Sequence, residues 1–303
     1  MHEDILRSVL RTLLVNGFDL LSLRKSSPDK SIINVKKIDS LGGEINYSLL
    51  LSTGEPNEHL LDSLKITASD LKSTPIVISD ELQTASFKMY SISEFEDFFG
   101  GFVNTGLVLN DDLPNILEEL GYNRLPKDFT GKPDELLEIY TKECLQFLLN
   151  SRARIYGNKR RGESLPDGVV IAGDGTIILF DSKACKDGFE FESDDINRFA
   201  KYVNDFNRKY SEILGRVFCL LVVSSSFNDS SDSIRKRSNA LYTKTGTKLS
   251  CIIANDLGRA VKEVRKSQEF RNSIDWKEIF VNDILTTDLI TKQLEKIKKD
   301  KLL

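Results

Sequence analysis

The pattern of apolar and polar residues divides the chain into two successive blocks, and each block contains both helical and strand-like periodicity. In the first block, residues 3–15 place apolar side chains every three to four positions, which is typical of an amphipathic helix. Period-two and short apolar runs then alternate with helical patterns. The predicted order after the first helix is strands 20–23, 32–35 and 45–51, helix 56–71, strand 75–79 and helix 92–99.

The second block again mixes the two periodicities. It opens with a helical face over 134–150, and the turn Gly173-Asp174-Gly175 separates two apolar runs, which favours a hairpin. The predicted order is helix 134–150, strands 168–172 and 176–182, helix 193–210, strand 217–223, helix 235–242, strand 248–254 and helix 256–266. Strands interleaved with helices predict an α/β fold for both blocks.

Glycine, proline and aspartate concentrate between the blocks. We therefore expect an α/β N-terminal domain at 1–104, a linker or small helical bridge at 105–133, and a second domain at 134–303. A chain of 303 residues is long enough for two domains with separate cores. No apolar run has the length of a membrane span, so we expect a cytoplasmic protein without membrane contact.

The counts of cysteine and histidine limit the kinds of metal site and catalytic group that the chain can contain. The four cysteines form no CxxC pair, which argues against a structural zinc site and a disulfide framework. The two histidines, His2 and His59, lie far along the chain from the residues discussed next. If the chain is an enzyme, carboxylates and lysine must perform the chemistry.

A candidate site stands at the hairpin of the second block. Asp167 follows Pro166 and precedes one predicted strand, while Asp181 and Lys183 end the next, after the apolar run 177–180. Residues two apart in a strand point to the same face, so the Lys183 ammonium lies beside the Asp181 carboxylate. A carboxylate at the end of a buried strand costs free energy unless a cation or a metal ion compensates it.

Two carboxylates and a lysine suit phosphodiester hydrolysis. Mg²⁺ prefers oxygen ligands and is usually held by one or two carboxylates plus substrate phosphate. A bound divalent ion neutralises the phosphate and stabilises the leaving oxygen. Asp-x-Lys and Pro-Asp-Gly are each common, so the triplet alone is equally compatible with a turn and an exposed charge pair.

Several ordered segments around these residues carry a resemblance. From about residue 136 to 266 the chain resembles the cleavage domain of FokI-type (type IIS) restriction endonucleases, in the PD-(D/E)xK nuclease superfamily. The segments that carry it are Leu137-Glu138 with Glu143, Tyr156 to Gly162, Pro166-Asp167-Gly168, Asp181-Ser182-Lys183-Ala184, Lys186-Asp187-Gly188-Phe189, Ile196 to Tyr202, Leu220 to Ser224 and Leu249 to Ala254.

The resemblance implies a fold and roles for matching residues. The fold would be a mixed sheet flanked by helices, of restriction-endonuclease type, preceded by a smaller α/β domain. Asp167 and Asp181 would bind Mg²⁺, with Mn²⁺ as a substitute, and Lys183 would position or activate the attacking water. Glu138 would be either an acid near the ligands or a structural helix residue. Phosphate contacts would come from Arg152, Lys159, Arg160 and Arg161.

Partners follow from the same resemblance. The substrate would be double-stranded DNA, cut by a homodimer that forms at least transiently on DNA, in restriction or phage defence. The net charge of −4 does not by itself indicate DNA binding. Two alternatives stay open: a nicking or repair nuclease subunit of a heteromeric complex, and an inactive DNA-binding protein with a nuclease fold.

The first block has a separate, fainter resemblance to an Mrr-like nuclease fold. In such a fold we expect the strand at 45–49 to occupy the acid-x-Lys position, yet it reads Ile-Asn-Tyr-Ser-Leu. A nuclease site there would be inactive. DNA binding, partner binding and a packing role are equally open for residues 1–104.

Overall fold

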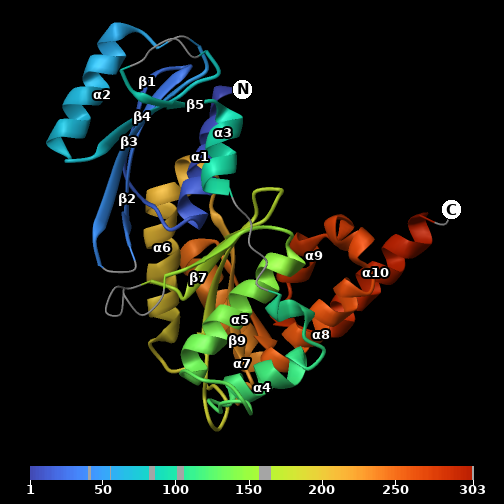
Figure 1. The fold of residues 1–303 in the computed structure, drawn as a ribbon. Helices are drawn as coiled ribbons and strands as arrows, with labels where there is room; N and C mark the ends of the chain where they lie inside the picture. Colours follow the sequence, from blue (N-terminus) through green and yellow to red (C-terminus); the bar gives the residue numbers. More distant parts are fainter. Residues whose placement is uncertain (40–41, 55, 82–85, 101–105, 157–164, 302–303) are drawn as a thin grey trace. The chain divides into compact units, whose positions relative to one another are not determined.

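The chain forms two units, Met1–Phe102 and Val103–Leu303, and each has its own sheet (Figure 1). The predicted α/β class is confirmed, because both units combine mixed sheets with helices. The computed structural model describes residues 1–39, 42–54, 56–81, 86–100, 106–156 and 165–301.

The first unit packs helices on both faces of a five-stranded sheet. Its elements are α1 (His2–Val15), β1 (Asp19–Ser27), β2 (Lys30–Ile38), β3 (Glu44–Ser52), α2 (Glu58–Asp70), β4 (Thr74–Ile78), β5 (Lys88–Tyr90) and α3 (Ile92–Gly100). Strands β1, β2 and β3 are antiparallel neighbours, and β4 and β5 continue the sheet in parallel. Helix α2 buries Leu64 against Ile32, Leu50 and Val77. On the opposite face, His2 of α1 is hydrogen-bonded to Ser31.

The second unit contains a six-stranded sheet in the order β11-β10-β9-β8-β7-β6. Its strands are β6 (Ala153–Ile155), β7 (Gly168–Ile171), β8 (Ile177–Lys183), β9 (Val217–Ser224), β10 (Lys248–Ile253) and β11 (Ile284–Leu285). Strands β6, β7 and β8 are antiparallel, whereas β8, β9, β10 and β11 run parallel. This sheet is therefore a hairpin meander joined to a parallel half at β8.

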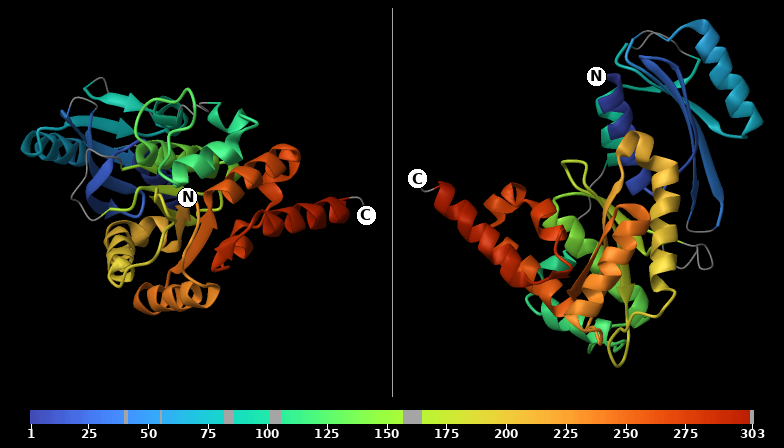
Figure 2. Two further views of the ribbon diagram at one scale, coloured as in Figure 1. Left: turned by 90° about the horizontal axis from the view of Figure 1, so that it is seen from below. Right: turned by 180° about the vertical axis from the view of Figure 1, so that it is seen from behind.

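Helices cover both faces of the second sheet. They are α4 (Leu113–Gly121), α5 (Pro133–Leu148), α6 (Asp195–Leu214), α7 (Ser231–Thr245), α8 (Ala254–Arg265), α9 (Trp276–Phe280) and α10 (Thr287–Lys301). Side chains of α4, α5 and α8 share one apolar core with Ile178, Phe180 and Leu221 of the sheet. Helices α6 and α7 lie on the other face, in front of the sheet in the right-hand view of Figure 2. In the described ranges, every helix is too short or too polar to cross a membrane.

The two units share one order of elements. Each contains a helix, three antiparallel strands, a second helix, and a strand parallel to the third strand. Strand β3 contains residues 45–49 and runs on to Ser52. Its last three residues are Leu50, Leu51 and Ser52, where β8 ends in Asp181, Ser182 and Lys183.

Some helices begin at other residues than the sequence predicts, because side-chain hydrogen bonds determine where the preceding turn ends. Helix α6 begins at Asp195, not at Ser193, because the Asp195 carboxylate accepts the Glu192 N–H and closes the preceding turn. Helix α7 begins earlier than predicted, since the Ser230 hydroxyl accepts the Ser233 N–H as an N-cap. Strands β5, β6 and β11 were not predicted, and their two or three residues are too short for a period-two pattern.

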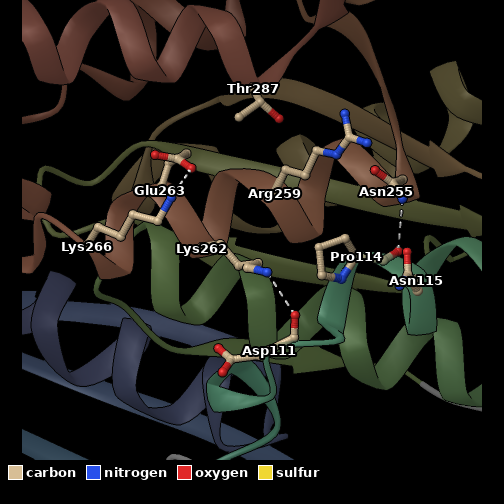
Figure 3. A pocket seen from close by; sticks show the side chains of 9 residues that line it. All are labelled: Asp111, Pro114, Asn115, Asn255, Arg259, Lys262, Glu263, Lys266 and Thr287. Atoms are coloured by element: carbon tan, nitrogen blue, oxygen red, sulfur yellow. Dashed lines mark hydrogen bonds and ion pairs between the residues drawn. The ribbon is translucent and has the colours of Figure 1, made fainter.

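The segment predicted as a linker or small helical bridge, 105–133, contains helix α4, which packs on α8 in the second unit. Leu113, Leu117 and Leu120 are fully buried there. A cavity of about 380 Å³ lies beside this contact, where Lys262 donates to the carbonyl of Asp111 (Figure 3). Its lining residues are Asp111, Pro114, Asn115, Asn255, Arg259, Lys262, Glu263, Lys266 and Thr287. The pocket does not include Asp167, Asp181 or Lys183.

Gly168 allows the close approach of three strands at the start of β7. A Cβ atom at this position would collide with the carbonyl oxygen of Arg154 in β6 and the ring of Phe180 in β8. Both neighbours are held by strand pairing, so neither can move away cheaply. Glycine is therefore required by packing directly beside Asp167.

We predict that Gly168→Ala destabilises the second unit by about 1–3 kcal/mol, because overpacking forces backbone or ring shifts. Gly173→Ala in the neighbouring turn is the matched control, since a Cβ there meets no atom within 4 Å. Urea unfolding monitored by circular dichroism measures the free energy of unfolding of both variants. Equal stability of the two variants would contradict this packing account.

Candidate active site

The pairing of β7 with β8 brings two aspartates side by side. Gly168 pairs with Phe180, and one residue beyond this pair on each strand lie Asp167 and Asp181. The backbone N–H of Ser182 donates to Oδ2 of Asp167, which fixes this carboxylate against the end of β8. Two acids that are fourteen positions apart in the sequence thus share one strand end.

Asp181 and Lys183 point away from the core that contains α5. Phe180 belongs to that core, and side chains alternate along a strand, so Asp181 and Lys183 face the α6 side of the sheet. The Asp181 side chain is 3% exposed and forms an ion pair with the Lys183 ammonium. A buried acid therefore directly follows the apolar run Ile177 to Phe180 in β8.

Asp167 carries the strongest electrostatic perturbation among these residues. Burial raises its pKa well above the ordinary value, and the charges of Asp181 and Glu138 raise it further. Lys183 and the Ser182 N–H act in the opposite direction without restoring the ordinary pKa. Two neighbouring carboxylates, of which Asp167 has a raised pKa and Asp181 is buried, form a place where added positive charge is favourable.

Lys183 remains a cation in this setting. Burial alone lowers the pKa of its ammonium, but Asp181 and Asp167 outweigh burial, and the pKa is raised. The ammonium also lies 6.0 Å from the centre of the Phe189 ring. A lysine with a raised pKa donates hydrogen bonds at neutral pH and does not accept a proton.

The donor set fits a hard divalent cation better than zinc. Oδ2 of Asp181 is buried, and the Lys183 ammonium is its ion-pair partner. Across the described ranges, His, Cys, Asp and Glu side chains do not gather in a group of three or more that could hold a metal ion. A site with two carboxylates leaves further positions to water and substrate, as is usual for Mg²⁺.

The other predicted site residues fall into two groups. Glu138 lies on α5, close enough for its charge to raise the pKa of Asp167, which places it beside the aspartate pair. Arg152 is half-buried directly before β6. Three predicted phosphate contacts, Lys159, Arg160 and Arg161, lie outside the described residues. The functional roles assigned to all these residues stay predictions.

Sequence reasoning missed residues on the two flanking helices. Thr141 of α5 accepts a hydrogen bond of 3.3 Å from the Ser182 hydroxyl. Tyr202 of α6 is buried, and its pKa is raised by burial and then by the charge of Asp181. Arg198, one turn before Tyr202, acts electrostatically on both Tyr202 and Lys183. In the sequence, the signal for Arg198 and Tyr202 is their Arg-x-x-x-Tyr spacing on the helix that follows Asp-x-Lys.

Comparison with known proteins adds independent information. A family model described as the FokI cleavage domain matches residues 115–286, more than half of the chain. A solved structure of restriction endonuclease FokI bound to DNA matches with 17% identity and a TM-score of 0.43, over 57% of this chain and 30% of that chain. A second structure of restriction endonuclease FokI matches with 18% identity and a TM-score of 0.41, over 51% of this chain and 28% of that chain.

The matched part spans less than a third of either FokI chain. No curated protein matches this sequence. The family model nevertheless covers the helix α5, the strand pair that bears Asp167 and Asp181, and the parallel strands that follow. The resemblance noted in the sequence is therefore confirmed, and the chain belongs to the family of the FokI cleavage domain.

Proposed function

We propose that this protein is a Mg²⁺-dependent DNA endonuclease of restriction type. The observation that carries the proposal is the strand-end pair of Asp167 and Asp181, with Lys183 ion-paired beside them. Membership of the FokI cleavage-domain family supports DNA as the substrate class. The reaction is hydrolysis: the water oxygen bonds to phosphorus, one P–O ester bond breaks, and a proton is transferred to the leaving oxygen.

The two aspartates and the lysine have different roles in this proposal. Asp167 and Asp181 would hold the metal ion through carboxylate oxygens, and the Ser182 N–H keeps the Asp167 carboxylate oriented. Mg²⁺, when bound, supplies positive charge that neutralises the phosphate and stabilises the leaving oxygen. Lys183 donates a hydrogen bond to the attacking water and orients it, since its raised pKa keeps it protonated.

One site of this kind cleaves one DNA strand. Cutting of a duplex therefore requires two copies of the chain, which associate at least transiently on double-stranded DNA. We assign the protein to restriction or phage defence in the cytoplasm, and Mn²⁺ is expected to replace Mg²⁺ because it accepts the same oxygen ligands.

We predict that Asp181→Asn lowers Mg²⁺-dependent cleavage of supercoiled plasmid by roughly a hundredfold or more, because it removes a carboxylate that would hold the metal ion whose charge stabilises the reacting phosphate. Asp174→Asn is the matched control, since Asp174 lies in the turn of the same hairpin and is bound to Thr176 and Lys277. Gel analysis of nicked and linear plasmid with time, with and without EDTA, measures the effect. Cleavage by Asp181→Asn at the control rate would refute the proposed site.

A second prediction follows from the raised pKa of Asp167. A folded pKa above that of the unfolded chain means that the ionised carboxyl costs stability as the pH rises above about 4, the ordinary value. Asp167→Asn removes this cost and keeps an acceptor for the Ser182 N–H. In EDTA at pH 7 the variant should therefore melt above the wild-type protein, and the difference should vanish near pH 4.

Mg²⁺ should reverse this order of stability. A ligand that binds only the folded protein raises its melting temperature, so Mg²⁺ stabilises the wild-type protein and leaves Asp167→Asn unchanged. Differential scanning calorimetry across a Mg²⁺ titration at pH 7 measures the melting temperatures of the wild-type protein and of Asp167→Asn. Equal responses of the two proteins to Mg²⁺ would show that Asp167 does not hold the ion.

A further inference from the structure

The end of strand β8 extends past the strand that pairs with it on one side. Strand β7 begins at Gly168, which pairs with Phe180, so residues 181–183 lie beyond the last β7–β8 pair. On their other side these three residues stay paired with β9. Towards β7, the Ser182 N–H donates to Oδ2 of Asp167. The orientation of the Asp167 carboxylate therefore depends on the orientation of the Ser182 peptide group.

The Ser182 hydroxyl links this peptide group to helix α5. It donates to Oγ1 of Thr141, and the two oxygens are 3.3 Å apart. Ser182 lies on the same face of β8 as Phe180, which belongs to the core that α5 shares with the sheet. Thr141 is fully buried, and buried polar groups are almost always hydrogen-bonded. The bond thus joins helix and strand end inside the protein.

Helix α5 is a rigid support for this bond. Leu137, Cys144 and Leu145 of the same helix are buried in the core, so α5 cannot shift without opening that core. A threonine in a helix is also restricted to two side-chain rotamers, which limits where its hydroxyl can lie. The Thr141 hydroxyl is therefore an acceptor at a fixed place. The restraint extends from α5 through Ser182 to the Asp167 carboxylate.

We propose that Thr141 is a positioning residue for the metal site: through the Ser182 hydroxyl it holds the Ser182 N–H, and with it the Asp167 carboxylate, in place for a divalent cation. This inference rests on the proposed function and deepens it, because it assigns a role outside the Asp-x-Lys motif. Partners that orient metal-binding side chains change metal affinity by roughly 10- to 100-fold. Thr141 acts through one further residue, so we expect an effect at the lower end, about tenfold.

The chain offers matched variants for a test. Thr141→Val keeps the shape of the side chain and removes the hydroxyl, whereas Thr141→Ser keeps the hydroxyl. Thr245→Val is the control, since Thr245 is also a buried helix threonine and its hydroxyl donates to the carbonyl of Leu241 in its own helix. Thr245 ends α7 just before β10 begins, at the opposite edge of the parallel strands from the end of β8.

The test is the dissociation constant of Mn²⁺, measured at pH 7 without DNA by electron paramagnetic resonance of the free ion. We expect Thr141→Val to bind Mn²⁺ about tenfold more weakly than the wild-type protein. Thr141→Ser and Thr245→Val should bind it as the wild-type protein does. Ser182→Ala removes the other half of the hydroxyl pair and should weaken binding as Thr141→Val does. The double variant should be no weaker than Ser182→Ala, because both changes remove one and the same bond.

Melting temperatures in EDTA separate positioning from stability alone. A structural role alone would lower the melting temperature of Thr141→Val and leave the Mn²⁺ dissociation constant of the folded protein unchanged. That result, or additive losses in the double variant, would overturn the assignment. Ser182→Ala decides the question if Thr141→Val does not fold.

The same measurements distinguish this inference from the proposed function. A wild-type protein that binds Mn²⁺ with the expected dependence on Thr141, but cuts no DNA, would refute the proposed activity alone. A wild-type protein that cuts DNA, with a Thr141→Val variant of unchanged Mn²⁺ affinity, would refute the role of Thr141 alone. Absence of Mn²⁺ binding by the wild-type protein would reject both the metal site and the positioning role.

Discussion

Repulsion between Asp167 and Asp181 is the interaction on which the site depends. The pairing of β7 with β8 fixes the two acids at one strand end, and the Ser182 N–H prevents Asp167 from turning away. Burial raises the pKa of Asp167, and the charge of Asp181 raises it further. Added positive charge is favourable at such a place, which is why the proposed Mg²⁺ site is assigned to these two carboxylates.

The architecture of the second unit serves to hold this strand end from both faces. On one face, Phe180 and the residues of α5 form the apolar core that keeps β8 in place. On the other face, Tyr202 of α6 is buried, and the charge of Asp181 contributes to its raised pKa. Gly168 permits β6, β7 and β8 to approach closely enough for the two acids to meet. The first unit repeats the order of elements but ends its third strand without an acid.

Much of this could be predicted from the sequence, because the strongest patterns are local. The hairpin that brings Asp167 near Asp181 follows from two apolar runs around Gly173-Asp174-Gly175, and the structure contains β7 and β8 there. The short strands β6 and β11 escaped prediction because they are stabilised by neighbours distant in sequence. Arg198 and Thr141 escaped for the same reason: their proximity to the site depends on how α6 and α5 pack on the sheet.

The most direct test of the account is to locate the metal ion. Crystals of the protein grown with Mn²⁺, measured at a wavelength where manganese scatters anomalously, show where the ion binds without reference to activity. The account predicts an anomalous peak between the carboxylates of Asp167 and Asp181, and no peak in crystals of Asp181→Asn. A well-occupied peak elsewhere with none between these two carboxylates would contradict the central claim.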